Sequence, residues 1–193
     1  MLTNTRCLQM ALVLYLGAAA VATAQTYVVV VVPDTQNYSG HEENQPLFSQ
    51  QTAWIAENIE SENIVFVTQL GDVVGHIRTV VPIDEQWPFA DSAFRAIDGK
   101  VPYSVAWGNH DFDQFPPPAT GATTRDAQAW FGAARYADYD WFGGASPDGG
   151  NFYQVFQLGA IEIVHLAMRF RPEEADLNWA KKVLDQHPLK PAI

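Results

Sequence analysis

The strongest restriction on the fold of this chain is the alternation of three short apolar segments with two segments of helical periodicity. The apolar segments are 27–32, 64–67 and 101–107, and the first is a nearly continuous valine run, typical of a strand buried on both faces of a sheet. Apolar residues recur with helical spacing in 46–60 and 87–97. Strands separated by helices pair in parallel through right-handed crossovers, so the sequence predicts an α/β fold.

The C-terminal part of the chain is expected to add a hairpin and a last helix. Segments 151–158 and 161–166 have strand composition, and the Gly-Ala pair between them suits a two-residue turn. Segment 172–186 predicts an amphipathic helix, whereas the Gly-rich and Ala-rich segment 121–150 predicts a long loop with at most one short helix. The residues expected to face the core from the last helix are Leu177, Ala180 and Leu184. Four tryptophans are expected to pack in the core: Trp54, Trp87, Trp107 and Trp179.

Polar residues follow each of the three predicted parallel strands directly. Asp34 follows the first strand, Asp72 the second, and Asn109 and His110 the third. The carboxyl ends of neighbouring parallel strands form one crevice, so we expect these four side chains to lie together. Two carboxylates this close repel each other unless a cation lies between them, and carboxylate and amide oxygens suit Mg, Mn, Fe or Zn ions. The pattern therefore predicts a metal site.

Each motif also has a purely structural interpretation. Asp34 is at a position where an aspartate often caps a helix, and Gly71-Asp72 is an ordinary turn dipeptide. Segment 108–111 is different, because it places a glycine, an amide, an imidazole and a carboxylate directly after a strand. The occurrence of all three motifs at strand ends favours a shared site.

The order of these motifs resembles that of the calcineurin-like metallophosphoesterase family. The family signatures Asp-x-His, Gly-Asp and Gly-Asn-His-Asp/Glu correspond to segments 34–36, 71–72 and 108–111. Segment 33–38 is similar to an exported bacterial branch of the family in which Gln replaces the first His. The resemblance covers residue 27 to the C-terminus, and it implies the N-terminal portion of the family's α/β/β/α sandwich.

The resemblance implies a role for each matching residue. Asp34 would bind one metal ion, Asp72 would bridge two, and Asn109 would bind the second. His110 would face the leaving-group oxygen as its acid, and Asp111 would orient His110 and hold its proton. The implied cofactors are two divalent ions of Mn, Fe, Zn or Mg. The implied activity is hydrolysis of phosphoric esters, in which a metal-activated hydroxide attacks phosphorus.

Two departures from the family pattern affect these expectations. Gln36 stands at the place of the first His, and its amide oxygen is a weaker ligand than an imidazole. The later His and Gly-His-x-His ligands have no counterpart, and His187 does not match them. The residues present offer about four donors, whereas two metal ions take roughly eight to twelve positions. We therefore expect a domain in 25–193 that is incomplete at its C-terminus, binds metal weakly and turns over slowly.

The missing ligands leave a second hypothesis open. The chain could be a non-catalytic secreted binding protein that retains a relic half-site. A third hypothesis is an exported sugar-binding module, and only scattered aromatic residues support it. For the enzyme, the expected substrate is a phosphorylated small molecule or a phosphoprotein, and the shared motifs do not distinguish monoesters, diesters and nucleotides.

Residues 1–24 have the pattern of a signal peptide. Arg6 precedes the apolar segment 10–21, and Ala22-Thr23-Ala24 is a small-x-small cleavage site. The apolar segment is shorter than the ~20 residues that span a bilayer, which disfavours the alternative of an uncleaved anchor. We expect an exported, periplasmic or extracellular protein without stable membrane insertion. A net charge of -11 also argues against binding to duplex nucleic acid, which requires Lys and Arg.

Five further residues are weaker candidates. His41 and His76 follow the first two motifs and could line a substrate pocket, but exposed loop positions are the simpler interpretation. His165 lies in the predicted hairpin, where a structural position is favoured over a ligand. Arg169 and Arg171 could contact a phosphate, although salt-bridged or solvated arginines are more common.

Overall fold

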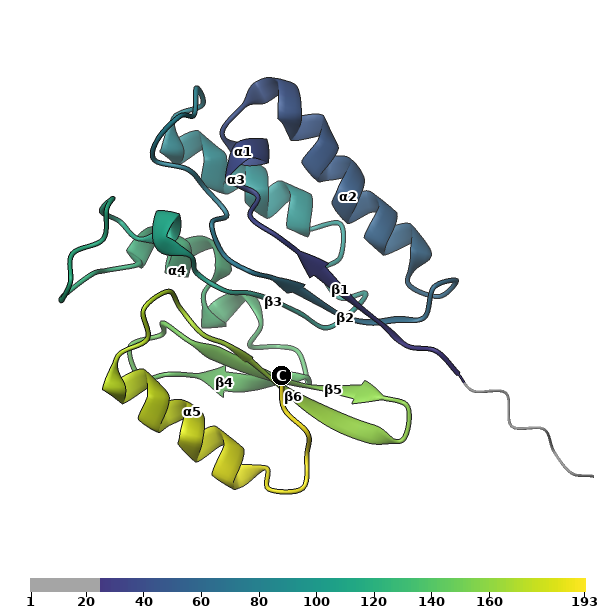
Figure 1. Cartoon of the computed structure of the whole chain (residues 1–193). Helices are drawn as coiled ribbons and strands as arrows, with labels where there is room; N and C mark the ends of the chain where they lie inside the picture. Colours follow the sequence, from purple (N-terminus) through teal and green to yellow (C-terminus); the bar gives the residue numbers. More distant parts are fainter. Residues whose placement is uncertain (1–24) are drawn as a thin grey trace, which may run out of the picture.

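The computed structural model describes residues 25–193, and it contains a parallel sheet of three strands near the N-terminus (Figure 1). The strands β1 (Val28–Val32), β2 (Ile64–Gln69) and β3 (Tyr103–Val105) pair in the order β1-β2-β3. The helices α2 (Gln45–Asn58) and α3 (Ile83–Phe94) connect them. The predicted order of strands and helices and the parallel pairing are therefore confirmed. The predicted signal peptide lies outside the described residues.

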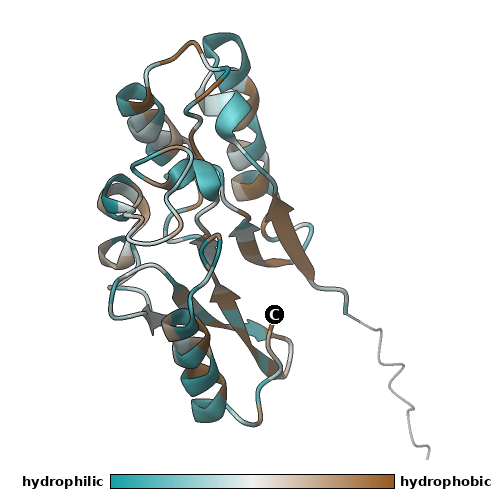
Figure 2. Ribbon diagram, turned by 60° about the vertical axis from the view of Figure 1, so that its left-hand side comes forward, coloured by the Kyte–Doolittle hydropathy of each residue, from teal (hydrophilic) through white to brown (hydrophobic). Residues whose placement is uncertain are grey.

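The first strand is less buried than its composition predicts. β1 lies at the edge of the sheet and pairs only with β2, so the side chain of Val31 is 53% exposed. The expectation of a strand buried on both faces is wrong for β1 and holds better for the central strand β2, in which only Val65 is not fully buried. Figure 2 shows that these strands are hydrophobic while the helices carry polar faces.

A second, antiparallel sheet follows, in the order β4-β5-β6. Its strands are β4 (Phe142–Ala145), β5 (Phe152–Leu158) and β6 (Ile161–Ala167). Leu158 pairs with Ile161, which confirms the predicted two-residue hairpin turn. Segment 121–150 contains more structure than expected: α4 (Arg125–Phe131), a 3-10 turn at Ala133–Arg135 and strand β4. Periodicity did not reveal β4 because its two central residues are glycines.

The two sheets contact each other through aromatic side chains. Phe66 of β2 stacks on Phe156 of β5 with 4.3 Å between ring centroids, and the ring of His165 lies 4.7 Å from that of Phe66. Nδ1 of His165 is 3.0 Å from Oε1 of Gln154 and 3.3 Å from Oγ of Ser104. His165 therefore has the structural position that we expected. Burial lowers its pKa to about 4, so its ring is neutral near pH 7.

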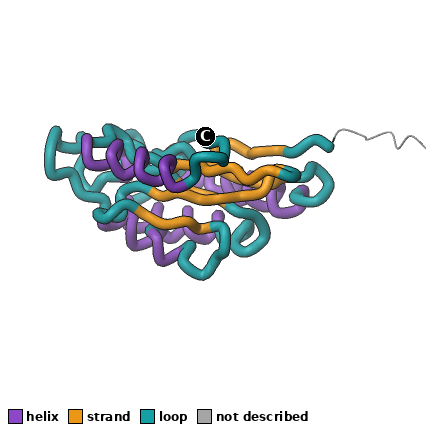
Figure 3. Tube along the Cα trace, turned by 90° about the horizontal axis from the view of Figure 1, so that it is seen from below, coloured by secondary structure: helices purple, strands orange, loops and turns teal. Residues whose placement is uncertain are grey.

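The helices lie outside the strands. In Figure 1, α2 and α3 are on the side of the first sheet that faces away from the second, and α5 (Glu174–Gln186) lies beside the second sheet. Seen from below, the strands lie in the middle with helical segments on both sides (Figure 3). The mixed α/β class is confirmed, whereas the N-terminal portion of the family's α/β/β/α sandwich stays a prediction. Within residues 25–193, no helix is long and apolar enough to cross a membrane.

The last helix presents a different face from the predicted one. Leu177 and Leu184 are 56% and 40% exposed, whereas Asp176 and Val183 are buried. Asp176 accepts hydrogen bonds from Arg169 and Asn151, and these bonds hold that side of α5 inward. The prediction of Leu177 and Leu184 as core residues is therefore wrong. Among the tryptophans, Trp87 and Trp107 are buried as predicted, Trp179 is half-buried, and Trp54 is 52% exposed.

After α5 the chain returns to the second sheet. The backbone N–H of Val164 donates to the carbonyl of Pro191, and the N–H of Ile193 donates to the carbonyl of Val164, both at 2.9 Å. Val164 and Ala192 thus form a parallel bridge at the free edge of β6.

A largely buried ionic cluster joins α3, β3 and the 3-10 turn after α4. The guanidinium of Arg135 is 10% exposed and pairs with Asp91 of α3 and with Asp98. It also donates to the hydroxyl of Tyr103 on β3, which in turn donates to Asp98. Opposite charges in direct contact compensate for the cost of burying them.

Candidate metal centre

The carboxyl ends of the three parallel strands meet at one edge of the first sheet (Figure 1). The N–H of Thr35, after β1, donates to the carbonyl of Asp72, after β2, at 3.0 Å. The N–H of Ala106, after β3, donates to the carbonyl of Gln69 at 2.9 Å. Backbone hydrogen bonds therefore continue past the strands and hold the three motif loops together.

Two glycines allow the second and third loops to touch. Gly71 has φ +100, and a Cβ there would fall on the backbone nitrogen of Gly108. A Cβ on Gly108 would in turn fall on Oδ1 of Asp72. The side chain of Gln69 clamps Gly71, because Oε1 accepts from its N–H and Nε2 donates to its carbonyl, both at 2.7 Å. The glycines of both motifs are thus required by a close backbone approach.

Asp72 lies at the centre of this edge. It is a non-glycine residue with φ 53, a conformation that is uncommon for L residues and is often found at functional sites. Its Oδ1 accepts a 2.9 Å hydrogen bond from the backbone N–H of His110. Burial raises the pKa of the Asp72 carboxyl; the hydrogen bond and the charge of His110 oppose that rise, and the charge of Asp34 adds to it. A cation beside Asp72 and Asp34 would stabilise both carboxylates.

Gln36 points toward the same carboxylate. Its Nε2 lies 3.5 Å from Oδ2 of Asp72, so the amide donates to Asp72. In this orientation Gln36 supports Asp72 rather than offering its own oxygen to a metal ion. A rotation of the amide by half a turn would present the oxygen instead.

His110 follows β3 and is buried. Its Nδ1 accepts a 3.3 Å hydrogen bond from the backbone N–H of His76, which places the proton of a neutral ring on Nε2. Burial lowers the pKa of the His110 imidazole, and the charge of His76 also lowers it, while those of Asp72 and Asp34 act in the opposite direction. His110 is therefore a neutral hydrogen-bond donor through Nε2 near pH 7.

Asp111 makes contacts other than the expected ones. Its Oδ1 accepts hydrogen bonds from the backbone N–H groups of Val73 and Val74, at 2.8 and 3.2 Å, and its Oδ2 accepts from that of Gly108 at 2.8 Å. The carboxylate thus joins the second and third loops, and His76 supplies the contact to the His110 ring that the resemblance assigned to Asp111. Burial raises the pKa of Asp111 to about 7, while the three N–H donors favour the ionised form.

Two residues with large effects on the site were not recognised in the sequence. Gln86 of α3 is buried and clamps the loop after the Gly-Asp motif: its Oε1 accepts from Gly75 and its Nε2 donates to the carbonyl of Val81, both at 2.7 Å. Phe115 stacks on the ring of His110 with centroids 4.1 Å apart. For Gln86, the only signal in the sequence was its polar side chain at an inward position of a predicted helix. For Phe115, the sequence contained no signal.

The weaker candidates have mainly structural contacts. Nε2 of His41 is 2.8 Å from the carbonyl of Arg78, and Nε2 of His76 is 2.9 Å from that of Phe112. His76 is half-buried beside His110 rather than exposed. Arg171 is exposed and lies over the ring of Phe170.

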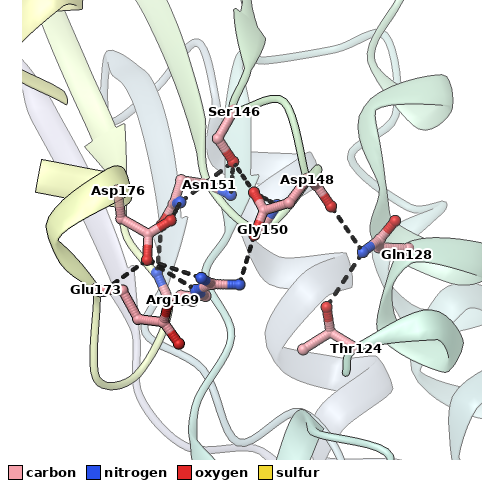
Figure 4. Close-up of polar contacts among 9 residues, drawn as sticks. All are labelled: Thr124, Gln128, Ser146, Asp148, Gly150, Asn151, Arg169, Glu173 and Asp176. Atoms are coloured by element: carbon pink, nitrogen blue, oxygen red, sulfur yellow. Dashed lines mark hydrogen bonds and ion pairs between the residues drawn. The ribbon is translucent and has the colours of Figure 1, made fainter. Parts of the chain in front are cut away.

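Arg169 belongs to a network of polar side chains that Figure 4 shows. Its guanidinium pairs with Asp176 at 2.8 Å and with Asp148 at 2.7 Å, and its backbone N–H donates to Asn151. Two carboxylates of the protein thus compensate the charge of the Arg169 guanidinium. This supports a salt-bridged arginine rather than one that contacts a phosphate.

Three side chains with oxygen atoms follow adjacent strand ends. Asp34, Asp72 and Asn109 provide oxygen atoms at adjacent strand ends, which is the chemistry that hard cations require. Within residues 25–193, however, no three or more His, Cys, Asp or Glu side chains are grouped closely enough to hold a metal ion. The chemistry of these oxygen atoms thus suits a cation, but the described residues show no complete metal-binding group, and the metal site stays a prediction.

Family models, curated sequences and solved structures were each compared with this chain. No family model matches the chain. The uncharacterized protein YvnB of Bacillus subtilis (strain 168) is 29% identical over 169 residues, which are 86% of this chain and 12% of that protein. A dimetal phosphatase from Danio rerio gives a TM-score of 0.44 and 17% identity, over 83% of this chain and 52% of the solved chain. The chain thus spans a small part of its curated relative and about half of the solved phosphatase.

The fold and the site define a mixed α/β protein with an acidic, oxygen-rich site at the carboxyl edge of a parallel sheet.

Proposed function

We propose that this chain carries the strand-end site of a metal-dependent phosphoric ester hydrolase of the calcineurin-like type. The observation that supports this most is the position of Asp72. Its carboxylate lies where three strand ends meet, accepts the N–H of His110, and is under the negative field of Asp34. A buried carboxylate with a second carboxylate nearby and a neutral imidazole beside it is suited to cation binding next to a hydrogen-bond donor.

Asp34, Asp72 and Asn109 are the residues proposed to hold divalent ions of Mn, Fe, Zn or Mg, with Gln36 as a support for Asp72. Bound divalent ions polarise phosphoryl oxygens and lower the pKa of a water molecule. These three side chains supply few of the roughly eight to twelve positions of two metal ions, so we expect weak metal binding by this chain alone.

His110 is proposed to act on the leaving group. Hydrolysis forms a bond between a water oxygen and phosphorus and breaks the bond to the ester oxygen, which must gain a proton or a hydrogen bond. The Nε2–H of His110 is available for this step because Nδ1 already accepts from His76. Asp111 keeps the loop that carries His110 attached to the loop that carries Asp72.

The biological setting is part of the same proposal. Its substrate would be a phosphorylated small molecule or a phosphoprotein. The pattern of residues 1–24 supports export to the periplasm or the medium. The acidic net charge disfavours duplex nucleic acid as a partner.

The test is hydrolysis of p-nitrophenyl phosphate and bis-p-nitrophenyl phosphate by the chain with Mn²⁺, beside its His110→Ala variant. We expect slow hydrolysis that requires the metal, a loss of about a hundredfold or more in kcat for the variant, and unchanged Mn²⁺ affinity by titration calorimetry. Equal hydrolysis by both proteins would contradict the role of His110. Absence of both Mn²⁺ binding and hydrolysis in the wild type would instead favour a non-catalytic binding protein.

A further inference from the structure

One aromatic side chain covers the two histidines beside the strand-end site. The ring of Phe115 is nearly parallel to that of His110, with an interplanar angle of 24° and centroids 4.1 Å apart. It is also nearly parallel to the ring of His76, at 14° and 5.6 Å. The centroids of His76 and His110 are 6.3 Å apart, so the three rings form a triangle in which Phe115 lies against both imidazoles.

The other restraint on the His110 ring is weak. The hydrogen bond from the N–H of His76 to Nδ1 is 3.3 Å long, at the long end of the range for such bonds. One long hydrogen bond by itself leaves the buried imidazole some freedom to rotate about its two side-chain torsions. Stacking on Phe115 removes that freedom, because the ring can then turn only by losing its aromatic contact.

Phe115 itself is held by a loop with fastened ends. The N–H of Asp113 donates to the carbonyl of Thr123 at 2.8 Å, and the carboxylate of Asp113 accepts from the hydroxyl of Thr123 at 2.6 Å. The same carboxylate accepts from the side chain of Arg125 and from the backbone N–H of Asp126, at the start of α4. Hydrogen bonds across its base thus fix the 113–123 loop, which carries Phe115.

We infer that Phe115 is a positioning residue that holds the His110 ring in the orientation from which Nε2 reaches a leaving group. The inference rests on the proposed function for its effect on catalysis, but the position of the ring can be measured without catalysis. Phe115 acts through His110, so its loss should lower kcat while leaving KM and metal affinity nearly unchanged.

The experiment compares four variants of the full chain: Phe115→Ala, Phe115→Leu, Phe115→Tyr and Phe89→Leu. Leucine keeps the apolar volume without the flat ring, and tyrosine keeps the ring. Phe89 is a matched control, since it is a partly buried phenylalanine that packs on Phe48 of α2, with centroids 6.0 Å apart. Thermal unfolding confirms that each variant is folded.

Two quantities are then measured. Histidine ring NMR reports the tautomer of His110 and the shift that a neighbouring aromatic ring imposes on its carbon-bound protons. Steady-state kinetics with p-nitrophenyl phosphate and Mn²⁺ reports kcat and KM.

We expect Phe115→Ala and Phe115→Leu to move the His110 ring signals downfield and to lower kcat about tenfold, with KM changed less than about twofold. Phe115→Tyr and Phe89→Leu should resemble the wild type in both measurements. Unmoved His110 signals in a folded Phe115→Ala variant would overturn the inference, as would an equal kcat loss in Phe115→Tyr. If the wild type does not hydrolyse the ester, the proposed function fails, while the His110 tautomer still decides whether Phe115 positions the ring, because Nδ1 accepts from His76 only in the present orientation.

Discussion

The backbone N–H of His110 donates a 2.9 Å hydrogen bond to Oδ1 of Asp72, two residues that are 38 positions apart in the chain. This bond joins the loop after β3 to the loop after β2, and it orients the Asp72 carboxylate. The other oxygen, Oδ2, faces Gln36. Asp72 is thus fixed by both neighbouring loops, which makes it the residue whose replacement tests the site most cleanly.

Asp72→Asn should reduce metal binding without unfolding the protein. Asparagine is among the residues that tolerate positive φ, so the backbone at φ 53 can be kept, and its side-chain oxygen can still accept the N–H of His110. We expect the Kd for Mn²⁺ to rise at least about tenfold in titration calorimetry, because the site loses a negative charge. Asp84→Asn, at an exposed position in the first turn of α3, is the control and should bind as the wild type does.

Gly108→Ala should disturb the contact between the second and third loops. The added Cβ would fall on the Asp72 carboxylate and on its backbone nitrogen, so one loop has to move. Overpacking of this kind costs about 1–3 kcal/mol in the free energy of unfolding, measured by urea denaturation. The control is Gly121→Asn, since nothing lies within 4 Å of that position and asparagine tolerates its φ of +69. Equal stability of Gly108→Ala and wild type would show that the loops are not in close contact.

Arg135→Met should be among the most destabilising single changes outside the site. It leaves Asp91 without its buried partner and removes the contacts to Asp98 and Tyr103. Loss of one member of a buried ion pair costs about 3–5 kcal/mol. Arg95→Met removes the other partner of Asp91, but Arg95 is 67% exposed, so we expect a cost of at most about 1 kcal/mol. Similar midpoints for both variants in urea would argue against a structural role for the cluster.

His165 should make the fold sensitive to mild acid. Its pKa is about 4 in the folded protein, against 6.5 for an ordinary histidine, so between these pH values the unfolded chain binds the extra proton. Stability is therefore complete above about pH 6.5 and is lost as the pH falls toward 4, by up to about 3 kcal/mol from this group. His165→Asn should show a smaller loss between pH 7 and pH 4.5 in urea unfolding. Parallel curves for both proteins would contradict a buried neutral His165.

The order of the three parallel strands and of the two long helices α2 and α3 between them followed from the sequence, because each of these segments has a clear apolar period. Convergence of Asp34, Asp72 and His110 followed from the rule that parallel strands end at one edge. The orientation of individual side chains could not be predicted from the sequence. Asp111 was expected to contact His110, but it lies nearer to the N–H groups of Val73 and Val74, and only the three-dimensional approach of two loops decides this.

Long-range packing explains the other differences. The face of α5 could not be predicted from apolar spacing, since the ion pair of Asp176 with Arg169 overrides the preference of Leu177 and Leu184 for the interior. The stack of Phe115 on His110 depends on a loop that Asp113 closes through hydrogen bonds, and no local pattern in the sequence marks it.

The proposed function requires that a divalent cation bind between the strand ends that carry Asp34 and Asp72. Anomalous diffraction from crystals grown with Mn²⁺ tests it most directly. We expect a manganese peak within ligand distance of carboxylate oxygens of both residues, and no such peak in crystals of Asp72→Asn. A manganese peak elsewhere with none at these strand ends, or an unchanged peak in the variant, would contradict it.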